Sequence, residues 1–317
     1  MWYYDCNKDK GGRINMAVKW IVTDMDGTLL DENDRITPIT KKYLLECQKH
    51  GIKLILASGR SYSRLMSYAK ELQMLEYEGY LIEVNGMALN RLKENERRIY
   101  DRLETEDIKE LFEYLKSLEV EVQGYEDKGV YYWIPEWQKS VKEKERERRG
   151  LSDEYPWLGG AWTWVTDSTN GYPEQRKILN WKELPLTLNK FGCLSSPEHM
   201  KRVYECLKER YGEKYEIVRT CPRLIEIAPK GITKGKALMR CMKSENISQD
   251  EVLVFGDGEN DIDMFSKVKY SIAMGNAEEY VKTHAYMTTE SNQNEGIAKA
   301  LSYFIDFLPP VKEEINE

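Results

Sequence analysis

The sequence predicts an α/β protein whose core is a Rossmann-like, doubly wound parallel sheet, interrupted by an inserted second α/β domain. Near both ends of the chain, short apolar segments alternate with segments of helical periodicity, which is typical of a parallel sheet. From about residue 87 to residue 228 this alternation stops, and most of the tryptophans lie there. The 317 residues are enough for two domains of ordinary size.

The first part of the core is expected over residues 16–86, after a polar, aperiodic extension at residues 1–15 that we expect to be disordered. A buried strand begins at Ile21. Thr37 and Pro38 then fit the N-cap and first position of a helix. The elements expected next are a strand over 52–57, a helix over 61–74 and a strand over 80–84.

The second part of the core is expected over residues 229–317. Its predicted elements are a helix over 233–245, a strand over 251–255, a helix from Asp261, a strand over 270–274 and a helix over 295–307. The segments that lie between the two parts, residues 87–228, therefore form the inserted domain.

Two features of the inserted domain allow more than one interpretation. In the charged segment over 141–149, Glu143 precedes Arg146 and Glu145 precedes Arg148 by three residues, which favours a solvated helix face over a binding arm. Five tryptophan side chains of the inserted domain could stack on a sugar, but they are expected to fill the core of this domain instead. These tryptophans are Trp133, Trp137, Trp157, Trp162 and Trp164.

Composition favours a soluble, cytoplasmic protein that acts on a small molecule and binds neither nucleic acid nor membrane. The net charge of −7 argues against a nucleic-acid surface, which needs a basic face. The six cysteines include no C-x-x-C pair, so we expect reduced thiols. There is no apolar run near the roughly 18 residues of a membrane span, and the first residues lack the apolar stretch of a signal peptide, so we do not expect export. Since the chain has three histidines, without companions, carboxylates are expected to carry the acid–base chemistry.

A pair of aspartates follows the first strand. Asp24 and Asp26 stand one residue apart, and Gly27 and Thr28 continue the chain as a turn. They lie at the carboxyl end of a strand, where open α/β sheets bind ligands. Such close carboxylates repel each other unless a cation, a proton or ordered donors offset the charge, which indicates a divalent metal ion. A structural turn is the alternative, whereas an EF-hand is excluded by the position of Gly27.

Two further loops carry donors suited to an anion. Ser58, Gly59 and Arg60 end a predicted strand with a hydroxyl, an accessible amide and a guanidinium. Lys234 opens a predicted helix, whose positive end would hold an anion. Taken alone, a plain loop and a surface lysine are the better interpretations of these two segments.

A second acidic loop follows the predicted strand over 251–255. Asp257 begins this loop, and Asp261 lies one helical turn later. The loop is not a dinucleotide-binding fingerprint, because Asp261 stands where the third glycine is needed. It is not an EF-hand either, since Ile262 occupies the required glycine position.

The order of the loops, acid pair, hydroxyl, lysine and acid pair, resembles the haloacid dehalogenase superfamily. The spelling is similar to its Cof-type phosphatase branch in Asp24-Met25-Asp26-Gly27-Thr28, Ser58-Gly59-Arg60, Lys234-Gly235, Gly256-Asp257-Gly258-Glu259-Asn260-Asp261, and also in Asn85-Gly86, Ala273-Met274-Gly275-Asn276-Ala277 and Glu295-Gly296-Ile297. The resemblance covers about residues 16–86 and 224–308. It implies a haloacid dehalogenase-like core and, in the inserted domain, a type 2 cap that acts as an α/β lid.

The resemblance also implies a phosphatase mechanism. Asp24 would attack the phosphorus of a monoester and form an aspartyl-phosphate. Asp26 would protonate the leaving oxygen and then activate the hydrolytic water, which requires a raised pKa, while Thr28 would orient Asp26. Lys234 would supply electrostatic stabilisation together with the metal ion.

The same resemblance implies the ligands of the metal ion and of the phosphoryl group. Mg²⁺ would be held by Asp24, the backbone carbonyl of Asp26 and Asp257, with Asp261 behind them. The phosphoryl oxygens would be bound by Ser58, Gly59, Arg60, Lys234 and Asn260.

Three other functions fit the same residues less directly. A phosphomutase or phosphotransferase would share the core loops and pass the phosphoryl group to a hydroxyl. A phosphatase specialised for sucrose or trehalose phosphates belongs to the same branch. A non-catalytic metabolite sensor is the alternative from another class, although such a sensor need not keep both Asp24 and Asp26. We expect a small phosphorylated metabolite as partner, and a monomer or a homodimer.

Overall fold

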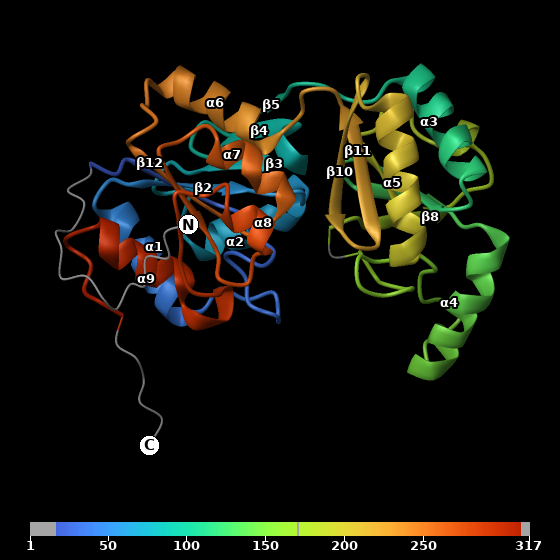
Figure 1. Cartoon of the computed structure of the whole chain (residues 1–317), viewed down its shortest axis with the longest axis horizontal. Coiled ribbons are helices and arrows are strands. Elements are labelled where there is room, and N and C mark those ends of the chain that lie inside the picture. Colours follow the sequence, from blue (N-terminus) through green and yellow to red (C-terminus); the bar gives the residue numbers. More distant parts are fainter. Residues whose placement is uncertain (1–16, 170, 312–317) are drawn as a thin grey trace. The chain divides into compact units, whose positions relative to one another are not determined.

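The computed structural model describes residues 17–169 and 171–311, so the extension at residues 1–15 lies outside the described residues. The chain forms two compact units. Of the described residues, the first unit joins those up to Ile99 with those from Thr233 onward, and the second unit takes those within Tyr100–Ile232 (Figure 1).

An eight-stranded sheet forms the centre of the first unit. Its strands are β1 (Trp20–Thr23), β2 (Lys53–Ala57), β3 (Tyr80–Glu83), β4 (Ala88–Arg91), β5 (Glu96–Ile99), β12 (Val252–Gly256), β13 (Tyr270–Ala273) and β14 (Met287–Thr288). The strand order is β14-β13-β12-β1-β2-β3-β4-β5. Pairing is parallel from β14 to β3, and β4 and β5 continue the sheet as an antiparallel hairpin.

Helices cover both faces of this sheet. They are α1 (Pro38–Lys49), α2 (Tyr62–Glu71), α6 (Lys234–Glu245), α7 (Ile262–Phe265), α8 (Glu279–Lys282) and α9 (Gly296–Phe304), with short 3₁₀ turns η1 (Val84–Gly86), η3 (Glu259–Asp261) and η4 (Asn292–Asn294). Figure 1 shows α1 and α9 on one side of the sheet and α6 and α7 on the other. The predicted doubly wound α/β core is therefore confirmed.

The alternation of side chains explains why the central strands are apolar throughout. Leu54 and Leu56 of β2 pack in a core cluster with residues of α1, α2 and α9. Ile55, which lies between them, is equally buried but points to the opposite face of the strand. A strand covered on both faces needs apolar residues at every position, and this produces the run that the sequence shows.

A carboxylate ties the last helix of the first unit to its first. The Glu295 Oε2 accepts hydrogen bonds from Thr37 Oγ1 at 2.6 Å, Thr40 Oγ1 at 2.8 Å and Thr40 N at 3.1 Å. The Thr37 side chain does not cap α1 itself. Glu295 therefore takes the place of the capping side chain, and its charge suits the positive end of the helix.

The second unit contains a six-stranded sheet with the order β10-β11-β9-β6-β7-β8. Its strands are β6 (Glu121–Tyr125), β7 (Gly129–Trp133), β8 (Glu174–Lys177), β9 (Lys190–Leu194), β10 (Tyr215–Cys221) and β11 (Leu224–Pro229), and its helices are α3 (Thr105–Ser117), α4 (Glu136–Arg149), α5 (Pro197–Tyr211) and the 3₁₀ turn η2 (Trp181–Glu183). Apolar residues of α3 and α5 pack on one face of this sheet. The inserted segment is thus an α/β domain.

The boundaries between the units differ from the predicted ones. The inserted domain is predicted to begin at residue 87 and to end at 228, whereas the compact units divide after Ile99 and after Ile232. The hairpin of β4 and β5 accounts for the first difference, because β4 pairs with β3 and extends the sheet of the first unit. The sequence of a hairpin does not show which of two sheets the hairpin extends.

The charged helix α4 only partly fits the expected solvated face. Arg148 and Glu145 form the expected exposed pair at 2.8 Å. Arg146, however, is buried and donates to backbone carbonyls of the loop at 152–156. Lys142 is also fully buried and pairs with Glu121 at 2.7 Å. The helix therefore uses two of its charges to bind other parts of its own domain.

The tryptophans divide between core and surface. Trp133 and Trp157 pack against buried clusters, as expected. Trp137 is 39% exposed and Trp162 is 77% exposed, so neither fills a core. The Trp164 ring lies 4.0 Å from the Arg223 guanidinium, in cation–π contact.

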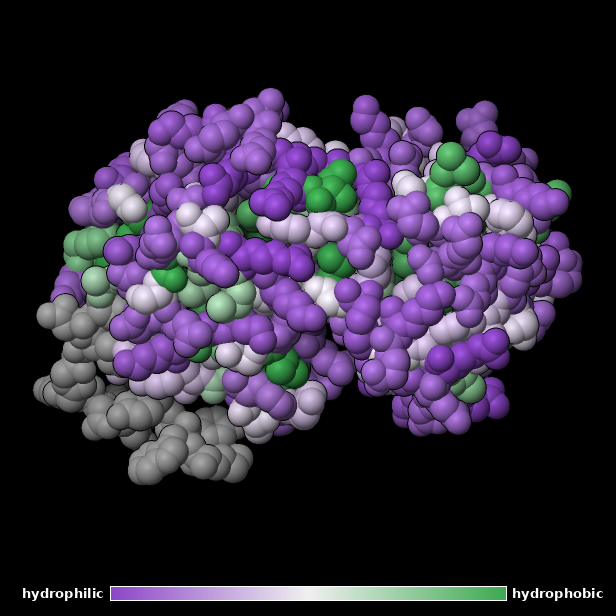
Figure 2. Space-filling model, turned by 90° about the horizontal axis from the view of Figure 1, so that it is seen from above, coloured by the Kyte–Doolittle hydropathy of each residue, from purple (hydrophilic) through white to green (hydrophobic). Residues whose placement is uncertain are grey.

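Figure 2 shows one face of the molecule, on which hydrophilic residues predominate and apolar residues are scattered. Among the described residues, none of the helices is long and apolar enough to cross a membrane.

We predict that Lys142→Ala destabilises the second unit by about 3–5 kcal/mol, because the buried Glu121 carboxylate would lose its counter-charge. Urea denaturation followed by tryptophan fluorescence measures this change. The matched control is Lys144→Ala, which removes an exposed lysine of the same helix. Equal unfolding curves for the two variants would show that the buried pair contributes nothing to stability.

Candidate active site

The four predicted loops meet in the first unit. Asp24 follows β1, Ser58 follows β2 and Asp257 follows β12, and β1 pairs in parallel with both of the other strands. Because parallel strands end at the same edge of a sheet, their loops lie side by side there. Lys234 is the first residue of α6, and its side chain reaches the same place.

Lys234 links two of the predicted acids. Its Nζ donates to Asp24 Oδ1 at 2.6 Å and to Asp261 Oδ1 at 2.8 Å. The Lys234 side chain is fully buried. Burial alone would lower the pKa of Lys234, but the charges of Asp24 and Asp261 and their hydrogen bonds outweigh it and raise the pKa. The lysine is therefore held as a cation, and it is not the surface residue that the sequence left as an alternative.

The carboxyl groups of Asp24 and Asp257 have raised pKa values. Burial raises the pKa of Asp24 well above its ordinary value, and the nearby carboxylates add to the shift, although Lys234 opposes it. Burial and the charge of Asp261 raise the pKa of Asp257 to about 7, against the hydrogen bond from Thr28. One lysine thus does not neutralise the negative charge gathered here.

The donor set fits a hard divalent cation. Asp24, Asp257 and Asp261 offer carboxylate oxygens that all lie within 4.8 Å of one another. Oxygen ligands of this kind suit Mg²⁺, and a cation would offset the burial and the repulsion that together raise the pKa values. The three acids are among the residues predicted as metal ligands.

Asp261 has a supporting position within this set. Its Oδ2 accepts hydrogen bonds from the backbone N–H groups of Asp257 and Gly258, at 3.1 and 3.0 Å, while Oδ1 accepts from Lys234. Both oxygens are therefore occupied by donors. This arrangement agrees with the expectation that Asp261 stands behind Asp24 and Asp257.

Thr28 has a different partner from the one expected. Its hydroxyl donates to Asp257 Oδ1 at 2.6 Å, whereas the resemblance implied that it orients Asp26. Gly27 explains how the turn reaches this loop: its φ is +80°, and a Cβ there would lie 2.3 Å from Asp257 Oδ2. The aspartate turn and the second acidic loop therefore touch directly, and Thr28 orients Asp257.

Arg60 binds the second aspartate of the motif. Its Nε donates to Asp26 Oδ2 at 2.8 Å, and its Nη2 donates both to Asp26 Oδ1 and, at 2.6 Å, to Asp34 Oδ1. The guanidinium that was predicted to bind a phosphoryl group is thus engaged by two carboxylates. Tyr68 completes the set, since its hydroxyl accepts from Arg60 Nη1 at 3.2 Å and donates to the Asp34 carbonyl at 3.1 Å.

The pKa of Asp26 is shifted opposite to the expectation. Loss of hydration would raise the pKa, but the hydrogen bonds and charge of Arg60, with help from Arg64 and Lys234, lower it below its ordinary value. The raised pKa expected for Asp26 is therefore wrong for this arrangement. The reason is a bidentate arginine, whose side-chain direction the sequence did not show.

The remaining predicted residues lie on the neighbouring loops. Ser58 is buried, and its Oγ accepts from Arg60 N at 3.1 Å, which leaves its hydroxyl hydrogen to donate elsewhere. Asn260 donates through Nδ2 to Asn85 Oδ1 at 3.1 Å. Gly59 packs close to Asn85, since a Cβ on Gly59 would lie 3.4 Å from its amide atoms.

Sequence reasoning did not assign Asp34, Tyr68 or Asn85 to the site. Asp34 lies in a polar turn and Tyr68 on a helix, and neither position carries a pattern that indicates function. Asn85 stands at a strand end like the other site residues, and this position was the available signal.

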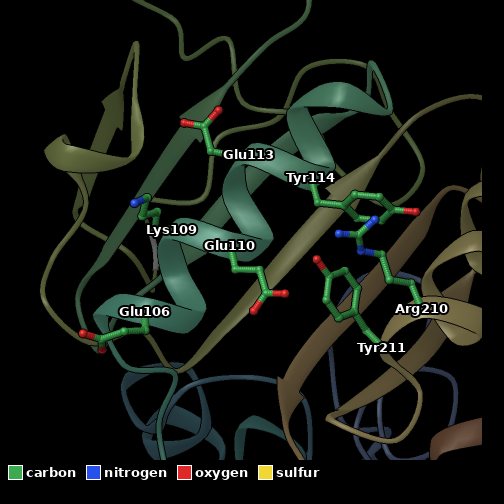
Figure 3. Close-up of a pocket in the computed structure, with 7 residues that line it drawn as sticks. All are labelled: Glu106, Lys109, Glu110, Glu113, Tyr114, Arg210 and Tyr211. Atoms are coloured by element: carbon green, nitrogen blue, oxygen red, sulfur yellow. The ribbon is translucent and has the colours of Figure 1, made fainter.

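A separate hollow in the second unit contains none of the predicted site residues. It has a volume of about 470 Å³ and is lined by Glu106, Lys109, Glu110, Glu113, Tyr114, Arg210 and Tyr211. Figure 3 shows that the lining side chains come from α3 and from the end of α5. The Arg210 guanidinium lies 4.7 Å from the Tyr114 ring centre and 5.3 Å from that of Tyr211, so it is held by packing.

Known proteins are similar to this chain over nearly its whole length. The chain is 26% identical to phosphatase YwpJ of Bacillus subtilis over 294 residues, which cover 91% of this chain and 100% of that protein. It is 25% identical over 296 residues to 5-amino-6-(5-phospho-D-ribitylamino)uracil phosphatase YcsE of the same organism, covering 92% and 98% of the two chains.

A solved structure agrees with these matches. A haloacid dehalogenase-like hydrolase from Bacteroides thetaiotaomicron has a TM-score of 0.70 and 25% identity, covering 90% of this chain and 98% of that chain. The model of the haloacid dehalogenase-like hydrolases matches residues 21–301, a range that contains all four loops of the site. The chain therefore belongs to the haloacid dehalogenase-like hydrolase family, and the resemblance seen in its loops is confirmed.

Proposed function

We propose that this hydrolase is a magnesium-dependent phosphatase of small phosphorylated metabolites, such as sugar phosphates or related monoesters, and that it forms an aspartyl-phosphate. The observation that carries the proposal is the position of Asp24, buried in a cluster of three carboxylates and bound by Lys234 at 2.6 Å. The name of the relative YcsE, a phosphatase of a phosphoribitylamino-uracil, supports a substrate of this class.

Asp24 is proposed as the nucleophile. Lys234 binds Oδ1 of Asp24, so Oδ2 is the oxygen proposed to attack the phosphorus in line with the leaving oxygen. The bond from phosphorus to the leaving oxygen breaks, and the aspartyl-phosphate is later hydrolysed by water, which returns the carboxylate. The ammonium group also stabilises charge on the phosphoryl oxygens in the transition state.

Asp26 is proposed to serve first as acid and then as base. Bound to Arg60 with a lowered pKa, it is in its deprotonated form, which is the form that takes a proton from the hydrolytic water. Donation of a proton to the leaving oxygen requires that its carboxylate first separates from Arg60 and takes up a proton from solvent. The proposed cycle therefore includes a change in the pairing of Asp26.

Magnesium is the proposed cofactor, held by Asp24, Asp257 and the backbone carbonyl of Asp26, with Asp261 behind. When bound, it would neutralise the carboxylates and stabilise negative charge on the transferring phosphoryl group. Ser58, Gly59 and Asn260 are proposed to donate to the phosphoryl oxygens. These groups would serve any monoester, so the proposal assigns recognition of the leaving group to the second unit.

The proposed surroundings of the reaction are the cytoplasm, where thiols stay reduced. The five cysteines within the described ranges are all free, which supports this assignment. A monomer or a homodimer with no nucleic-acid or membrane partner remains the proposed state.

Transfer to a hydroxyl acceptor in place of water is the second candidate, since it would use the same residues. Product analysis separates them, because a phosphatase releases inorganic phosphate in proportion to substrate consumed. A sensor would release none. A screen of phosphorylated metabolites with phosphate detection therefore tests the proposed function and ranks substrates at once.

We expect Asp24→Asn to abolish phosphatase activity without unfolding the protein, because an amide is a poor nucleophile and cannot form the acyl phosphate. The kcat should fall by more than about a hundredfold. Asp250→Asn, the same change at an exposed position, is the control. A variant that retained more than about a hundredth of the wild-type kcat would rule out Asp24 as nucleophile.

Removal of divalent metal should abolish turnover, and Mg²⁺ should restore it. The physical reason is the repulsion within the carboxylate cluster, which Lys234 alone does not offset. Phosphate release is measured in excess EDTA after metal analysis of the sample, and again after Mg²⁺ is added back. Full turnover by verified metal-free protein would contradict the proposed cofactor.

Lys234→Ala should lower kcat by at least about a hundredfold, the usual effect of removing a preorganised donor from a transition state. Lys236→Ala is the matched control, because Lys236 is exposed two residues later in the same helix. Circular dichroism shows whether both variants are folded. If the two substitutions had equal effects on kcat, Lys234 would not be the catalytic lysine.

A further inference from the structure

The short turn after β3 has an unusual backbone. Three consecutive residues have positive φ angles, +47° at Val84, +54° at Asn85 and +101° at Gly86. Glycine and asparagine adopt this region readily, but a β-branched valine does so at a cost. Such strain persists only where the surrounding structure enforces it.

Contacts to two site loops enforce this conformation. Val84 N donates to the Arg60 carbonyl at 3.1 Å, and Asn85 N donates to the Ser58 carbonyl at 2.9 Å. A Cβ at Gly86 would lie 2.3 Å from the carbonyl oxygen of Thr233, the residue before Lys234. The turn is therefore wedged between the loop after β2 and the start of α6.

The side chain of Asn85 connects these loops to a further one. Its Oδ1 accepts from Asn260 Nδ2 at 3.1 Å, and its amide atoms lie against Gly59. Asn85 is only 9% exposed. Three loops that follow different strands, β2, β3 and β12, thus meet at this one amide group.

We propose that Asn85 is a positioning residue that orients Asn260 and the Ser58-Gly59 loop for binding the phosphoryl group. The inference rests on the proposed phosphatase function. The side-chain amide of Asn260 has two N–H groups, and one of them donates to Asn85 Oδ1. This hydrogen bond fixes the orientation of the Asn260 amide. The second N–H of Asn260 is then left in a defined direction for a phosphoryl oxygen.

The experiment is a double-mutant cycle with Asn85→Gly and Asn260→Ala. Glycine adopts the positive φ without strain, so Asn85→Gly removes the side chain alone. The four proteins are compared by kcat/KM on p-nitrophenyl phosphate and by the inhibition constant of inorganic phosphate. Asn95→Gly is the matched control, since Asn95 has a φ of +51° and is exposed in the turn between β4 and β5.

Asn85→Gly is expected to lower kcat/KM and to raise the phosphate inhibition constant by at least about tenfold, and the control should change neither. If Asn85 acts through Asn260, the loss of kcat/KM in the double variant is smaller than the product of the two single losses. The difference is expected to be at least about fivefold, which is usual for coupled neighbours. The inference would be overturned if the effects of the two single variants multiplied fully in the double variant, or if Asn85→Gly lowered thermal stability without changing the kinetics. Either result would leave the proposed function standing.

A second variant covers the case in which Asn85→Gly does not fold. Asn85→Asp keeps the shape of the side chain and its tolerance of positive φ, and adds a negative charge beside Gly59. It is expected to raise the phosphate inhibition constant at least about tenfold through charge repulsion. An unchanged constant would overturn the inference. A wild type that hydrolyses no monoester would overturn the proposed function, and this inference with it.

Discussion

The repulsion between carboxylates is the constraint on which the site depends. Asp24, Asp257 and Asp261 gather within 4.8 Å, at a place where burial makes each charge costly. The protein offsets this cost partly with Lys234, which lies buried between two of the acids. Burial and the remaining negative charge raise the pKa values of Asp24 and Asp257, and a ligand that brings positive charge would offset both effects.

The sheet is what allows these groups to converge. Neighbouring parallel strands β2, β1 and β12 end at one edge, so short loops after each strand are enough to bring their side chains together. Close contact sets the details, as at Gly27, where a larger residue would collide with Asp257. The positions of the motifs in sequence thus follow from the strand order.

The sequence predicted the core strands and the site loops because both depend on local patterns. A strand buried on both faces is apolar at every position, as in Leu54–Leu56, and a loop after a strand is recognised by its polar residues. The partners of the charged side chains were harder to predict from the sequence. Arg60 could bind a phosphoryl group of the substrate or a carboxylate of the protein, and only the direction of its side chain decides between the two. Lys142 lies in a helix whose charges alternate, so its burial against Glu121 depends on tertiary contacts that periodicity does not reveal.

Asp24 and Asp26 have opposite environments within one short motif. Asp24 is buried near other carboxylates, which raises its pKa, whereas Asp26 is 61% exposed at its side chain and bound by a guanidinium, which lowers it. Alternating carboxylates at a strand end point in different directions and meet different neighbours. Two chemically identical groups are thereby separated into one that is held by a lysine among other carboxylates and one that is bound by an arginine. Such a division of environment would suit the nucleophile and the acid–base group of the proposed mechanism.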